Sequence, residues 1–111
     1  DFLAEPISGQ IESFLSFSCL NLAQPNGQPC LGRELVRSGR VGAFWGAVGH
    51  VSTDANQKLA RLGIDSLLQP EVLNIGDWMQ NMNKKIQVEN SRCLSSAWRL
   101  YRLVGNPGAL I

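Results

Sequence analysis

The sequence predicts an all-α fold, a small bundle of four to six helices. Apolar residues recur at three- and four-residue spacing in several segments of the 111-residue chain, which is the periodicity of an amphipathic helix. Ser, Asp or Asn precedes several of these segments, where an N-cap is expected. Hydrophobic residues make up 44% of the chain and charged residues 17%, enough for a buried core. We expect a helical domain over residues 32–111, preceded by an N-terminal helix and turn-rich linker over residues 1–31.

The first helix expected runs from Pro6 to about Leu22, with the proline in its first turn. The turn-forming cluster Gln24–Pro29 follows and is the best candidate for a boundary. Because the chain begins with Asp1 rather than methionine, we expect that it was processed or cut from a longer protein. The residues at three-four spacing in this helix are Ile7, Ile11, Phe14, Leu15, Ser18 and Leu22.

The segment from Gly32 to Val51 gives a mixed signal, because glycines interleave with large apolar residues. Each glycine inside a helix costs about 1 kcal/mol relative to alanine. Gly42, Gly46 and Gly49 would form, with nearby alanines, a small-residue face on which another helix packs closely. The alternative is a segment that inserts into a membrane or a partner, since glycine with Phe and Trp also suits an interface.

The next helix is expected to begin at Ser52 or Thr53, either of which can cap it, and to run to Leu62. Asp54 would lie near the positive end of its dipole. Gly63 fits the left-handed conformation that ends a helix.

A further helical segment is expected from Asp65 or Ser66, which can cap it. Pro70 disturbs this segment, because proline removes a backbone hydrogen bond and clashes with the preceding turn. Gly76 ends it.

Two more helices complete the predicted bundle. The first begins at Asp77 and the second at Asn90 or Ser91, and the cluster Gly105–Gly108 stops the second. On the first helix, one face carries Trp78, Met79, Met82 and Ile86. The buried stripe of the last helix is expected to be Leu94, Ala97, Trp98, Tyr101 and Val104.

The three cysteines, Cys19, Cys30 and Cys93, are an odd number without paired spacing. We expect buried thiols in a reducing, cytoplasmic compartment, with one disulfide and one free thiol as the alternative. His50 is the only histidine, so no zinc or other metal site is expected. Because no motif for a nucleophile, a carboxylate pair or a phosphate loop is present, we expect no catalytic activity of its own.

The net charge of +1 and the distribution of basic residues predict no binding to nucleic acid. The longest apolar run, Val41 to Val48, is too short to cross a bilayer, so no transmembrane segment is expected. Arg92, Arg99 and Arg102 are expected on the polar face of the last helix. Such a face is usually only solvated, and its natural ligand would be a phosphate or an acidic protein partner.

The segment Leu62–Leu68 carries the most informative motif. Its Ser66 follows Asp65 and is flanked by leucines at an expected helix start, where free N–H groups and the helix dipole favour an anion. The same residue types are also expected at a junction between two ordinary helices, where Leu-Gly ends one helix and Asp-Ser caps the next.

Together with the preceding segment Asp54–Arg61, this motif resembles the acyl and peptidyl carrier proteins, over about residues 54–75. The resemblance implies a four-helix bundle in which Ser66 bears phosphopantetheine and Asp65 helps to position the modifying enzyme. It further implies a docking helix after Ser66, supported by Leu67, Leu68 and Val72. Pro70 inside that helix departs from the pattern, as do Lys84 and Lys85 beyond it.

Two functions are therefore expected. The first is a carrier-like domain that presents thioester intermediates to partner enzymes. The alternative is a non-catalytic, all-helical protein-interaction module within a larger assembly, which holds a protein partner in an apolar groove or on the Arg92/Arg99/Arg102 face. A continuous helix over residues 66–75 with Ser66 exposed at its start would favour the carrier, and a buried Ser66 would favour the module.

Overall fold

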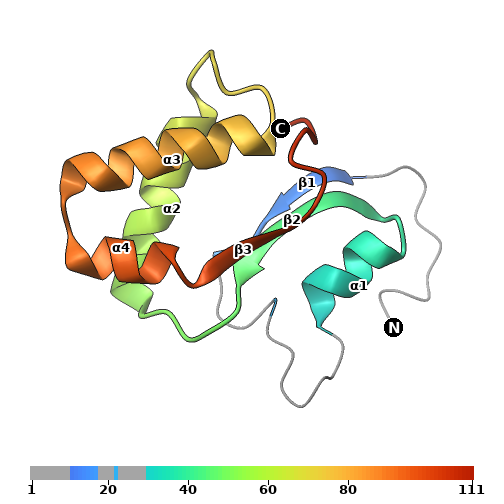
Figure 1. The fold of residues 1–111 in the computed structure, drawn as a ribbon, viewed down its shortest axis with the longest axis horizontal. Helices are drawn as coiled ribbons and strands as arrows, with labels where there is room; N and C mark the ends of the chain where they lie inside the picture. Colours follow the sequence, from blue (N-terminus) through green and yellow to red (C-terminus); the bar gives the residue numbers. More distant parts are fainter. Residues whose placement is uncertain (1–10, 18–21, 23–29) are drawn as a thin grey trace.

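A computed structural model describes residues 11–17, 22 and 30–111 of the chain (Figure 1). Within these residues, four helices accompany a three-stranded mixed sheet. The predicted all-α bundle is therefore wrong. The elements in chain order are β1 (Ile11–Leu15), α1 (Leu31–Arg37), β2 (Val41–Ala47), α2 (Thr53–Leu67), α3 (Ile75–Glu89), α4 (Arg92–Trp98) and β3 (Tyr101–Gly105).

The sheet has the order β1-β2-β3, with β1 parallel and β3 antiparallel to the central strand β2. Phe14 of β1 pairs with Phe44 of β2, and Trp45 pairs with Leu103 of β3. Parallel neighbours need a crossover connection, and the chain between β1 and β2 contains α1. The strand Ile11–Leu15 lies inside the helix predicted from Pro6 to Leu22, so that prediction is wrong for these residues. The other residues of the predicted helix, except Ser16, Phe17 and Leu22, lie outside the described part of the chain.

The central strand β2 forms from the segment that gave the mixed signal. Val41 to Ala47 is almost continuously apolar and nearly all buried, as expected for a strand covered on both faces. A Cβ on Gly42 would lie 2.7 Å from the backbone oxygen of Glu12, so glycine allows the close approach of β1. The predicted small-residue helix face is therefore wrong, and the alternative of an inserting segment is corrected to a buried strand.

The two faces of the sheet bury two separate cores. Phe44 packs with Leu35 of α1 on one face, while Trp45 faces the helices α2, α3 and α4 on the other. The Trp45 ring stacks on Tyr101 at a centroid distance of 4.1 Å and meets Trp78 edge-on at 4.8 Å. This aromatic cluster fixes the helical layer against the sheet.

The helix α2 begins where the sequence predicts and ends later. The Ser52 hydroxyl accepts a hydrogen bond from the Ala55 N–H at 3.2 Å, which confirms one of the two predicted caps. The helix then continues through Gly63 to Leu67, so the predicted end at Leu62 and the helix start at Asp65 or Ser66 are wrong. Residues 68–73 form turns and irregular backbone, and Pro70 lies among them.

The last two helices also differ from the prediction at their ends. Asn74 caps α3, accepting from the Asp77 N–H at 2.8 Å, so Gly76 lies inside this helix rather than before it. Ser91 caps α4, accepting from the Leu94 N–H at 3.3 Å, as one of the two alternatives predicted. The helix α4 ends at Trp98, and the predicted continuation to Val104 is wrong because residues 101–105 pair with β2.

Candidate functional site

Ser66 lies in the last turn of α2 and not at a helix start. Its side chain is 0% exposed, and its Oγ has no hydrogen-bond partner among the described residues. The adjacent Asp65 is exposed. A transferase would need the hydroxyl at the surface, so the buried position gives no support to phosphopantetheine attachment, which stays a prediction.

The docking helix implied by the carrier resemblance is absent, because α2 ends at Leu67 and α3 begins at Ile75. Leu67 is partly buried against the core, and Val72 is buried. Leu68 is 76% exposed. Of the three apolar residues predicted to bind partners, only Leu68 thus offers most of its side chain to a partner.

Arg92, Arg99 and Arg102 are all exposed, yet they do not share one helix face. Arg92 opens α4, Arg99 is its C-cap, and Arg102 belongs to β3. The guanidinium of Arg102 donates to the carbonyl oxygens of Arg99 and Tyr101. The predicted basic helix face is therefore wrong, because the helix that would carry it ends at Trp98.

Cys30 is buried just before α1, whereas Cys93 is exposed, and both are free thiols. The prediction of buried thiols thus holds for Cys30 and is wrong for Cys93, while Cys19 lies outside the described residues. Cys93 and His50 line one hollow of about 210 Å³ beside α4. Among the described residues, no group of three His, Cys, Asp or Glu is placed to hold a metal ion.

A groove lies between α2 and α3 and extends to Leu94 of α4. It consists of two hollows of about 320 and 260 Å³, which share Leu62 and Glu89. The other residues lining the first hollow are Asp65, Lys84, Lys85 and Val88. The other residues lining the second hollow are Lys58, Arg61 and Leu94. We call these nine residues the α2–α3 groove.

Helical periodicity assembles this groove. Lys58, Leu62 and Asp65 are spaced four and three residues apart, so they share one face of α2. Lys85 and Glu89 are likewise one turn apart on α3. Of these residues, only Asp65 was among the predicted site residues. The three-four spacing of Lys58, Leu62 and Asp65 is a sequence signal for the α2 wall alone, because only the fold places the α3 residues beside it.

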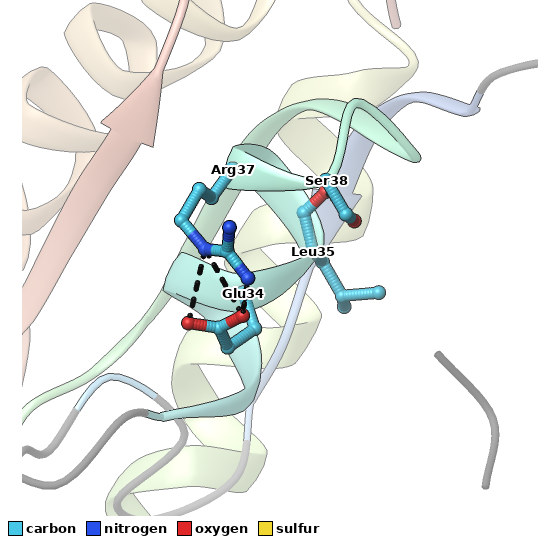
Figure 2. Close-up of polar contacts among 4 residues, drawn as sticks. All are labelled: Glu34, Leu35, Arg37 and Ser38. Carbon is cyan, nitrogen blue, oxygen red and sulfur yellow. Dashed lines mark hydrogen bonds and ion pairs between the residues drawn. The ribbon is translucent and has the colours of Figure 1, made fainter. Parts of the chain in front are cut away.

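One ion pair joins two described residues, and it lies on α1, away from the groove. Nη2 of Arg37 is 2.5 Å from Oε2 of Glu34 (Figure 2). The hydrogen bonds and charge of Arg37 hold the pKa of the Glu34 carboxyl below its usual value. By contrast, Lys58, Arg61 and Lys84 of the groove are exposed and have no ion-pair partner within the described part of the chain.

No helix in the part of the chain that the structure describes combines the length and the apolar character needed to cross a bilayer. Comparisons with protein-family models, with curated proteins and with solved structures find no match for this chain. The function of this chain is therefore inferred from the geometry and chemistry of the α2–α3 groove.

Proposed function

We propose that this chain is a non-catalytic protein-interaction module of mixed α/β architecture, and that the α2–α3 groove is its binding surface. The observation that carries this proposal is the combination of an apolar floor with unpaired positive charges around it. Leu62 and Leu94 form the floor, and Val88 projects at the edge with 84% of its surface exposed.

The exposed apolar surface gives a partner something to bury. Removing a valine or leucine side chain from water contributes roughly 1.5–3 kcal/mol. Val88 and the half-buried Leu62 thus supply an anchor point between two helices. The surrounding charges favour one orientation and speed the encounter, as charges at interfaces generally do.

The helical layer is built to hold this groove in a fixed shape. Trp98, the last residue of α4, donates its indole N–H to Oδ1 of Asn83 on α3, at 2.6 Å. Tyr101 of β3 donates its hydroxyl to Oδ1 of Asn56 on α2. Rigid walls reduce the conformational entropy that binding costs.

Site-specific photo-crosslinking tests the proposal. A photoreactive phenylalanine analogue is placed at Val88 and, as a matched control, at Arg33, an exposed residue of α1 on the opposite side of the sheet. In an extract of the source cells, we expect a discrete protein adduct from position 88 and none from position 33, and the captured protein, identified by mass spectrometry and purified, should bind the chain directly. Equal labelling from both positions, or no adduct from position 88, would contradict the groove as a binding surface.

A further inference from the structure

We infer that the partner of the α2–α3 groove is an acidic, amphipathic helical segment, which places an apolar side chain against Leu62 and Val88 and its carboxylates against the groove lysines. This inference rests on the proposed function and adds the chemistry of the partner.

The length of the groove suits a short helix. Lys58 and Asp65 bound it along α2, and seven residues of helix rise about 10 Å, or two turns. A partner helix of two turns presents apolar residues at positions i, i+3 or i+4, and i+7 along one stripe. The stripe can follow the apolar floor formed by Leu62 and Leu94. Helices commonly bind to proteins in this manner.

Both walls of the groove carry positive charges. Lys58 and Arg61 come from α2, and the adjacent Lys84 and Lys85 come from α3. None of these cations has an ion-pair partner within the described residues. Carboxylates of a partner helix, placed on either side of its apolar stripe, would complement both walls at once.

The groove also carries two carboxylates, and they argue against a nucleic acid. Asp65 lines the first hollow, and Glu89 lines both hollows. Either group would repel a continuous phosphate backbone, whereas a peptide can place neutral or basic residues opposite them. The apolar Val88 at the edge likewise offers nothing to phosphates or to sugar hydroxyls.

A titration followed by nuclear magnetic resonance tests the inference on the ¹⁵N-labelled full chain. The probe is a synthetic helix of about 15 residues, the length at which isolated helices begin to form, with a leucine stripe flanked by glutamates. Matched probes carry lysine for each glutamate or serine for the central leucine, and an oligothymidylate serves as a polyanion. We expect the acidic probe alone to shift the amides of Leu62, Val88 and Glu89.

Two variants and a salt series complete the test. We expect Lys84→Glu with Lys85→Glu to weaken binding of the acidic probe at least tenfold, while Arg99→Glu with Arg102→Glu changes it less than twofold. Binding should also weaken as salt rises from 50 to 500 mM, because exposed charges are screened. Equal binding of the lysine probe, no shift with the acidic probe, or groove shifts with the oligothymidylate would overturn the inference. An adduct at position 88 without acidic-probe binding would leave the module standing and reject only the partner chemistry.

Discussion

The indole N–H of Trp78 donates a hydrogen bond to the backbone oxygen of Gly63 at 3.0 Å, joining α3 to the interior of α2. Gly63 is buried, and a Cβ at this position would lie 3.2 Å from the Trp78 ring and 2.8 Å from Cζ of Phe17. The glycine that resembles a helix terminator is thus a contact point between helices. Its absent side chain leaves room for the two aromatic rings.

This contact predicts that Gly63→Ala destabilises the protein. Alanine gains about 1 kcal/mol of helix propensity over glycine, but overpacking a tight core typically costs 1–3 kcal/mol. Because Phe17 and Trp78 both lie within the distance of a clash, we expect a net loss of about 1 kcal/mol in the free energy of unfolding, measured by urea denaturation. Ile64→Ala, at an exposed neighbour, serves as the control. A Gly63→Ala variant more stable than the wild type would refute the packing role.

The unpartnered hydroxyl of Ser66 predicts a different response to substitution. A buried polar group without a hydrogen bond costs roughly 1–3 kcal/mol, so Ser66→Ala should leave the free energy of unfolding unchanged or raise it. Ser66→Asp should lower it by several kcal/mol, because a charge would be buried without a partner. Thermal melts of the two variants beside the wild type measure both effects. A marked loss of stability in Ser66→Ala would show that the hydroxyl has a partner in solution.

Intact mass spectrometry tests the carrier function directly. Because Ser66 is 0% exposed, incubation of the folded chain with coenzyme A, Mg²⁺ and a broad-specificity phosphopantetheinyl transferase should leave its mass unchanged. An authentic carrier protein in a parallel reaction provides the positive control. A single phosphopantetheine adduct that disappears in Ser66→Ala would reinstate the carrier and require the end of α2 to open.

The Glu34–Arg37 pair on α1 predicts a small pH effect. Hydrogen bonding from Arg37 lowers the pKa of Glu34 below its usual value, so the stabilisation is present above the ordinary glutamate pKa. It is lost as the pH falls through the lowered value, when the folded carboxyl takes up a proton. A ¹³C titration of the Glu34 carboxyl should therefore give a midpoint that moves up in Arg37→Gln. An unchanged midpoint would mean that the ion pair does not persist in solution.

Local signals predicted the parts of the fold that depend on neighbouring residues. Ser52 and Ser91 were among the predicted caps, and Trp78, Met82 and Ile86 do form the buried face of α3. These features follow from hydrogen bonds and spacing within a few residues.

The errors arise where distant segments decide the local structure. Tyr101–Gly105 continues the helical spacing of α4, but pairing with β2 turns it into a strand. Glycine commonly ends a helix, but Gly63 lies inside α2. Its backbone oxygen accepts a hydrogen bond from Trp78, which is fifteen residues away in the sequence. The α2–α3 groove could not be predicted from the sequence for the same reason. Its walls come from α2 and α3, and only the fold brings Lys58 and Lys84 to one surface.

The proposed binding surface is tested most directly by the effect of groove charge on crosslinking of the natural partner. The photoreactive residue at position 88 is combined with Lys84→Glu and Lys85→Glu, or with Arg99→Glu and Arg102→Glu as a control of equal charge change. Circular dichroism first establishes that both proteins melt as the parent does. We expect the adduct to be lost in the lysine variant and retained in the arginine variant. An adduct that survives the lysine reversal, or is lost equally in both, would contradict the groove as the site where this protein holds its partner.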